Sequence, residues 1–200
     1  MVRATLATSV RFAPREGRTQ SGGIAYKIYN MIGRPTPDEA DSYFLTYIQK
    51  VTGEDPLRAI ENQLDQYSPW LRRISEEKSL HRYAPGKWSM KQVLNHISDT
   101  ERTFAFRALW FARGFTDPLP GIDQLVAADG AQADKIPWSA HVEEFTRVRV
   151  GTISLYRNLP KEAWMRKGIA SGFPFTVRSL AFIIPGHVEH HCRILKEKYL

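Results

Sequence analysis

The stretch Gly186-His187-Val188-Glu189-His190-His191, near the end of the printed sequence, decides how the rest of the chain is interpreted. His187 and His191 are four residues apart in a segment with helical apolar spacing, so a helix would place both imidazoles on one face. Such a pair supplies only two ligands to a metal ion. His96, on an earlier predicted helix, offers a third. The sequence therefore predicts a metal site formed by His96, His187 and His191.

Four long segments have the apolar periodicity of amphipathic helices, and turn residues separate them. Helix caps and apolar spacing place them from Asp55 through Leu71, from Ser89 to about Gly114, from Ser139 to about Asn158, and from Thr176 through Leu195. No strand-like alternation competes with these helices. Pro69 and Pro185 lie inside two of them. Pro69 predicts a kink or a break just before it, and Pro185 predicts a kink or a freed carbonyl at Ala181.

The fold class that follows is all-α, a four-helix bundle. The first connection between long helices is short and suits antiparallel neighbours, whereas residues 115–138 form a long connection that can return along the whole bundle. This predicts an up-down-down-up order. A short extra helix is expected before the bundle, between Thr36 and about Gly53. Residues 31–200 are expected to form one domain.

Residues 1–30 are Arg-rich and lack a sustained apolar period, which predicts a disordered N-terminal extension. An over-long start assignment is the alternative, because Met31 opens the part that resembles a folded domain. This segment carries five basic residues and one acid, so it holds much of the net charge of +7. The remainder is only mildly basic and has no signature of a known nucleic-acid-binding module, which argues against nucleic acid as a partner.

The apolar stretch around the C-terminal histidines, Leu180 to Pro185, is far shorter than the roughly 20 residues that a membrane-crossing helix needs. We therefore expect a soluble protein with no membrane segment. Cys192 is the single cysteine, so no internal disulfide can form, and its position beside His191 suggests an apolar filler rather than a nucleophile. This usage fits a reducing, cytoplasmic compartment.

A histidine inside a bundle is more often a hydrogen-bonded core residue than a ligand. Three imidazoles in an apolar seam need polar partners, however, and one metal ion would supply all three. Neutral imidazoles suit zinc, nickel or ferrous iron, and three protein ligands leave a position open for chemistry. His81 and His141 are expected to be ordinary surface or capping residues. Three acids lie near the predicted ligands, Asp99, Glu101 and Glu189, and helical spacing directs Glu189 outward. His190 points to the flank of its helix. Four aromatic residues either wall a pocket or belong to the core: Trp88, Phe104, Trp110 and Trp164.

Three motifs resemble those of the DinB-like superfamily of metal-binding four-helix bundles. They are residues 85–102 (PGKWSMKQVLNHISDTER), residues 119–124 (LPGIDQ) and residues 181–191 (AFIIPGHVEHH). The resemblance covers roughly residues 31–200. It implies an up-down-down-up bundle, one divalent ion on His96, His187 and His191, and often a homodimer. Pro185 departs from the usual pattern, and residues 1–30 have no counterpart.

The superfamily includes transferases and isomerases that use low-molecular-weight thiols, and many members described as metal-dependent hydrolases. The leading hypothesis is therefore a metal-dependent enzyme that acts on a small molecule, either a thiol S-transferase or a hydrolase. A non-catalytic metal-binding stress-response protein is the alternative. A basic nucleic-acid-binding module comes third, and it would require Lys and Arg side chains to cluster on one face.

Overall fold

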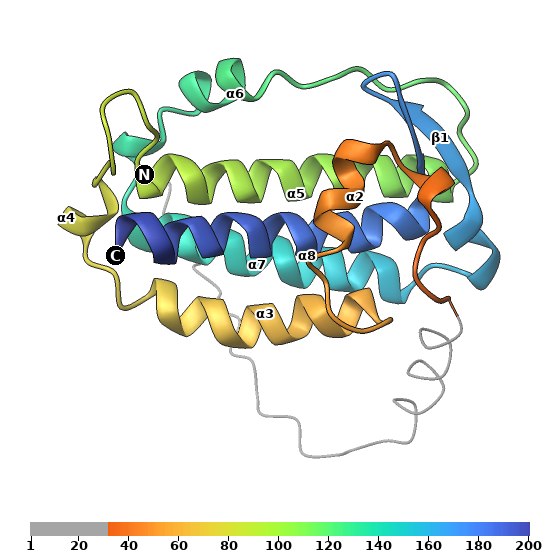
Figure 1. The fold of residues 1–200 in the computed structure, drawn as a ribbon, viewed down its shortest axis with the longest axis horizontal. Helices are drawn as coiled ribbons and strands as arrows, with labels where there is room; N and C mark the ends of the chain where they lie inside the picture. Colours follow the sequence, from red (N-terminus) through yellow and green to blue (C-terminus); the bar gives the residue numbers. More distant parts are fainter. Residues whose placement is uncertain (1–31) are drawn as a thin grey trace, which may run out of the picture.

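Residues 32–200 are described by a computed structural model (Figure 1). The two alternatives for residues 1–30, and the start of the domain at Met31, lie outside the described residues. Within the described part, four long helices form the body of the molecule, and they match the four predicted segments. They are α3 (Pro56–Leu71), α5 (Met90–Ala112), α7 (Trp138–Arg157) and α8 (Val177–Ile194).

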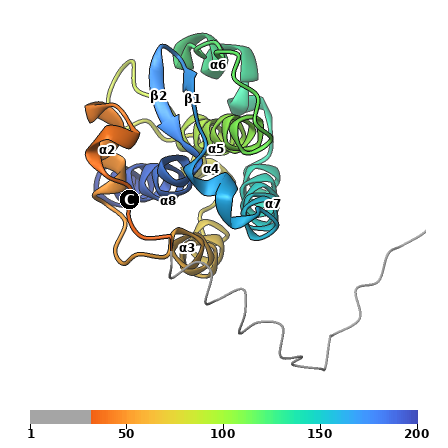
Figure 2. The same ribbon diagram turned by 90° about the vertical axis from the view of Figure 1, so that its right-hand side faces the viewer.

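The four helices have the predicted order. Helices α3 and α8 run in one direction, and α5 and α7 run in the other (Figure 1). Viewed along the bundle, α5 packs between α7 and α8, and α3 packs against the same two helices on the opposite corner (Figure 2). The all-α, up-down-down-up prediction is therefore confirmed, with the addition of one small sheet.

Local capping chemistry fixes the helix starts that the sequence predicted. The Asp55 carboxylate accepts hydrogen bonds from the first backbone N–H groups of α3. Ser89 and Thr176 each form a reciprocal capping box, with Gln92 and Ser179 respectively. Because these contacts reach at most three residues along the chain, they can be recognised from sequence.

Neither internal proline breaks its helix. Pro69 lies in the last turn of α3, which continues to Leu71. Helix α8 is continuous through Pro185, whose carbonyl accepts a hydrogen bond of 2.9 Å from the Gln63 side chain of α3. Of the two alternatives at Pro69, a kink or a break, the break is therefore wrong.

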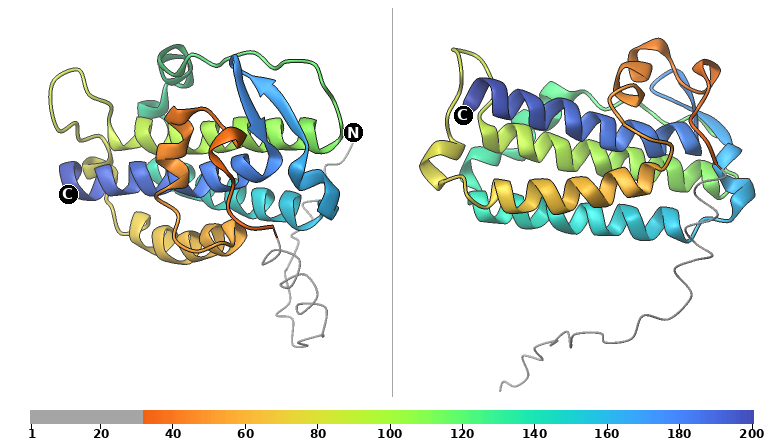
Figure 3. Two further views of the ribbon diagram at one scale, coloured as in Figure 1. Left: turned by 45° about the vertical axis from the view of Figure 1, so that its right-hand side comes forward. Right: turned by 60° about the horizontal axis from the view of Figure 1, so that its bottom comes forward.

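The expected short N-terminal helix is present as a 3₁₀ turn, η1 (Pro37–Glu39), followed by α2 (Ser42–Ile48), which crosses α8 (Figure 3). Other short helical elements lie in the connections: α4 (Glu76–Ser79), α6 (Gln124–Ala131), η2 (Ala133–Lys135), η3 (Lys161–Met165) and η4 (Leu195–Tyr199). None of the helices among residues 32–200 combines the length and apolar character that a bilayer crossing requires.

The expectation that no strand occurs was wrong. An antiparallel hairpin, β1 (Lys167–Ala170) and β2 (Phe173–Thr176), occupies the stretch that was expected to be irregular. Its two-residue turn, Ser171-Gly172, has positive φ at both positions, the geometry of a tight hairpin turn. Each strand has only four residues, too few for alternation to be visible in the sequence. The hairpin lies at one end of the bundle beside α2 (Figure 3).

His141 was expected at the surface or in a cap and is instead buried. Only 1% of its surface is exposed, and its Nε2 lies 2.9 Å from the carbonyl oxygen of Ala133. The long connection between α5 and α7 buries this ring, because η2 folds back over the start of α7. The burial of Cys192 agrees with its predicted role as an apolar filler, and burial raises the pKa of its thiol to about 12.

Candidate metal centre

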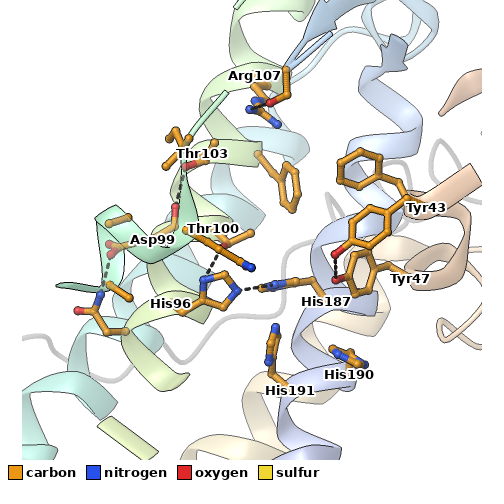
Figure 4. Close-up of a pocket in the computed structure, with 18 of the residues that line it drawn as sticks. Tyr43, Tyr47, His96, Asp99, Thr100, Thr103, Arg107, His187, His190 and His191 are labelled. Atoms are coloured by element: carbon orange, nitrogen blue, oxygen red, sulfur yellow. Dashed lines mark hydrogen bonds between the residues drawn. The ribbon is translucent and has the colours of Figure 1, made fainter. Parts of the chain in front are cut away.

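The three predicted ligands meet between two helices. His96 projects from α5, and His187 and His191 project from α8 (Figure 4). One nitrogen from each ring can be chosen so that all three lie within 4.8 Å of one another. The i, i+4 spacing aligns the α8 pair, and the packing of α5 on α8 brings in the third ring.

The spacing of the nitrogens fits a single ion. Nε2 of His96 lies 3.2 Å from Nε2 of His187. Two nitrogens bound at about 2.0–2.1 Å to one tetrahedral ion are roughly 3.3 Å apart. The ring centroid of His191 lies 4.4 Å from that of His187 and 4.9 Å from that of His96, so the third ring lies beside the other two. The residues present therefore suit a divalent transition ion.

Burial keeps the imidazoles in the form that binds metal. It lowers the pKa of His96 to about 4 and that of His191 to about 3, and it lowers the pKa of His187 as well. All three rings are accordingly neutral near pH 7, with a lone pair available. The Thr100 hydroxyl lies 3.4 Å from Nδ1 of His96. That contact leaves Nε2 of His96 directed toward the other rings.

The histidines open into a cavity of about 740 Å³ between α5, α8, α2 and α6. Trp88 and Phe104 line it, as expected for two of the four aromatic candidates. Trp164 is fully buried, so it belongs to the core. Trp110 does not line the cavity either, and it is partly buried against the same core. A cavity of this volume can accept a small organic molecule.

Helix α2 contributes a wall of the cavity that the sequence did not reveal. Tyr43 and Tyr47 line it, and their hydroxyl oxygens are 2.9 Å apart (Figure 4). The Tyr47 ring contacts His187 and His190 edge to face. His190, expected on the flank, also lines the cavity, although it does not join the three clustered ligands.

The three nearby acids have separate fates. Asp99 lines the cavity, where it accepts a 2.6 Å hydrogen bond from the Asn95 amide. Glu101 is buried on the other side of α5 against Arg149. Glu189 accepts a hydrogen bond from Tyr67, away from the cavity, in agreement with its predicted outward direction. Asp99 is the one carboxylate among the described lining residues.

Two further polar lining residues, Arg107 and Ser171, were not singled out from the sequence. Arg107 lies eleven residues after His96, a spacing that returns to nearly the same helix face. Helical periodicity alone could therefore have placed Arg107 on the same side of α5 as His96. Ser171 is at the hairpin turn, and nothing in the sequence placed that turn beside α5.

Comparisons with known proteins agree with this architecture. The family model described as DinB superfamily matches residues 59–195. No curated protein matches the chain. A solved structure with the same fold is YfiT from Bacillus subtilis, described as a probable metal-dependent hydrolase with an unusual four-helix bundle topology. It superposes with a TM-score of 0.58 at 17% identity, over 85% of this chain and 95% of that chain. Since the family model covers more than half of the sequence, the chain belongs to the DinB superfamily.

Proposed function

We propose that this protein is a metal-dependent hydrolase that acts on a small organic molecule, with one zinc, nickel or ferrous ion on His96, His187 and His191. The observation that carries the proposal is the opening of three neutral, clustered imidazoles into a cavity of about 740 Å³. The similarity to YfiT, itself described as a probable metal-dependent hydrolase, supports the same reaction class. A divalent ion bound there would lower the pKa of a water molecule and polarise a substrate carbonyl or phosphoryl group.

The chain's own residues have distinct roles in this proposal. The histidines bind the ion, and the Asp99 carboxylate accepts a proton from the attacking group. Asn95 donates to one carboxylate oxygen of Asp99 at 2.6 Å, and Arg102 contacts the other at 3.3 Å, which fixes the orientation of the carboxylate. The aromatic lining from Trp88, Phe104 and Phe44 excludes water around an apolar part of the substrate.

Thiol transfer is the second candidate. Cys192 is fully buried and its thiol pKa is raised to about 12, so a thiol would have to come from a small cosubstrate. The cavity of about 740 Å³ has room for such a cosubstrate, and its volume suits either reaction. Parallel assays with and without low-molecular-weight thiols separate the two reactions. The homodimer and cytoplasmic location also stay predictions, the former tested by light scattering.

The first experiment is elemental mass spectrometry on tag-free protein. About one ion per chain is expected in the wild type and far less in His96→Ala and His187→Ala. His81→Ala is the matched control, since His81 is exposed and does not line the cavity. Asp99→Asn should retain the ion and lose turnover by about 10²–10⁴-fold, the usual contribution of a positioned base. Equal metal content in all variants would overturn the site, and bound metal without turnover on any substrate would favour the non-catalytic alternative.

A further inference from the structure

Arg107 is a buried cation in the cavity without a carboxylate partner. Its side chain extends from α5, only 5% of the residue is exposed, and it lines the same cavity as the histidines (Figure 4). One guanidinium nitrogen, Nη2, donates to Ser171 Oγ at 2.7 Å and to the Pro120 carbonyl at 3.3 Å. No acidic side chain within residues 32–200 forms an ion pair with it.

Two other arginines show what is missing. Arg149 is fully buried and pairs with Glu101 at 3.0 Å, and the partly buried Arg178 pairs with Glu39. Burying a guanidinium without an opposite charge is costly, so a fold ordinarily provides one. Burial lowers the pKa of Arg107, yet a guanidinium starts so high that it stays charged near neutral pH. The free positions on its Nε and Nη1 are therefore suited to an anion that the protein does not itself supply.

Ser171 adds a second, independent observation at the same place. It has φ of +54°, a left-handed conformation that a residue with a side chain rarely adopts. Glycine would suit this turn better, as Gly172 beside it illustrates with φ of +80°. Strained positions of this kind persist where the side chain is needed. Because Ser171 Oγ accepts its hydrogen bond from Arg107, the hydroxyl hydrogen remains available to donate into the cavity.

The distance between the two ends of the cavity suits one small molecule. Arg107 and His96 share a face of α5, about 16 Å apart along the helix axis, and Arg side chains on a helix lean toward its N-terminus. The ring of Phe104 lines the wall of the cavity between them. Its centroid is 5.7 Å from the Arg107 guanidinium carbon and 6.3 Å from the His187 ring centroid. A small molecule lying along the Phe104 ring could therefore reach both the cation and the histidines.

We propose that Arg107 and Ser171 form an anion subsite that binds a carboxylate of the substrate, so that the opposite end of the same molecule lies at the histidines. A planar carboxylate matches the fork of the guanidinium, and an apolar body of a few carbon atoms matches the aromatic lining between the ends. A phosphonate or phosphate shares the oxyanion chemistry. As a substrate subsite this inference rests on the proposed function, but anion binding itself is testable without metal or turnover.

The experiment measures binding to metal-free protein by NMR titration, with 4-phenylbutyrate, its uncharged amide and phenylpropylphosphonate as probes. The wild type should bind the carboxylate at least tenfold more tightly than the amide. Arg107→Gln should remove that preference and leave weak binding of the amide unchanged. Arg113→Gln, which removes an exposed charge at the end of the same helix, should keep it. Tighter binding of the phosphonate than of the carboxylate would overturn the choice of carboxylate.

A second variant guards against loss of folding in Arg107→Gln. Ser171→Gly relieves the left-handed strain but removes one hydrogen-bond acceptor of Arg107, so thermal melting checks that it folds. The folded variant should bind the carboxylate about threefold to tenfold more weakly. Equal carboxylate binding by the wild type and folded Arg107→Gln would overturn the subsite. His187→Ala separates the two proposals, because it should lose metal and retain carboxylate binding. A wrong metal site would therefore leave the carboxylate result unchanged, and a wrong anion subsite would leave the metal result unchanged.

Discussion

The backbone carbonyl of Tyr47 lies directly against Gly186, one residue before the metal ligand His187. A Cβ at position 186 would overlap the carbonyl oxygen and carbon of Tyr47. Glycine therefore allows α2 to cross α8 in close contact. That crossing places the Tyr43 and Tyr47 hydroxyl groups over the cavity beside the histidines. One missing side chain thus couples the position of a helix outside the bundle to the shape of the site.

Gly186→Ala should consequently destabilise the protein and disturb the cavity. Alanine normally favours a helix interior, but here its methyl group must displace backbone, and overpacking of this kind costs about 1–3 kcal/mol. Urea unfolding gives the free energy of unfolding. Gly151→Ala is the matched control, since Gly151 lies within α7 with open space around it, and it should gain about 0.5–1 kcal/mol. Gains of similar size in both variants would show that α2 is not held in this contact.

The buried pair Arg149 and Glu101 gives a second prediction. Arg149 also donates to the Gln63 side chain at 2.6 Å, so its charge is compensated from α3 and α5 together. Glu101→Ala leaves the guanidinium buried without its counter-ion and should cost about 3–5 kcal/mol in urea unfolding. The exposed pair Arg147 and Glu143 is the comparison, because Glu143→Ala should change stability by less than about 0.5 kcal/mol. A small loss for Glu101→Ala would mean that water or rearrangement compensates the buried charge.

Glu39 predicts a dependence of stability on acid pH. Burial alone would raise the pKa of its carboxyl, but hydrogen bonds from Arg178, Thr36 and Thr176 outweigh burial and lower it to about 2. The unfolded chain therefore takes up this proton first as the pH falls from about 4.5 toward 2, and stability is lost across that window by linkage. Above pH 4.5 the full contribution is present.

Urea unfolding at a series of pH values checks the Glu39 prediction. Below pH 4.5 the free energy of unfolding of the wild type should fall as the pH falls. Its slope against pH should correspond to the uptake of up to about one more proton on unfolding than in Glu39→Gln. Asp38→Asn is the control, because the neighbouring Asp38 side chain is exposed in the same turn, and it should keep the wild-type slope. A wild-type slope in Glu39→Gln would assign the acid sensitivity to other carboxyl groups.

The extent of sequence prediction follows the range of the interactions involved. The caps at Asp55, Ser89 and Thr176, the helical periodicity and the i, i+4 pair on α8 are local patterns, so the bundle and two of three ligands could be read directly. His96 was accessible because its position at the edge of an apolar stripe restricts where it points. The contact of α2 with Gly186 joins segments more than a hundred residues apart, and no local signal reports it.

Features created by the long connections were missed for the same reason. The burial of His141 depends on η2 folding back over α7, and the approach of Ser171 to Arg107 depends on a hairpin of two four-residue strands. In each case the residue type was visible, but its surroundings come from another part of the chain. The hydrogen bond from the Gln63 side chain to the Pro185 carbonyl likewise joins residues 122 positions apart, so no local pattern reports it.

Metal binding should stabilise the folded protein through the triad specifically. An ion that binds only the native state at one hundred times its Kd adds about 2.7 kcal/mol, which for a chain of 200 residues corresponds to a Tm increase of roughly 5–10 °C. Thermal unfolding of metal-free wild type with and without added zinc should show this shift. His191→Ala should lose most of it, because two imidazoles bind far more weakly than three. His81→Ala retains all three clustered rings and should shift like the wild type. A shift of the same size in His191→Ala would place the ion elsewhere on the chain, and it would remove the basis for assigning hydrolysis to this cavity.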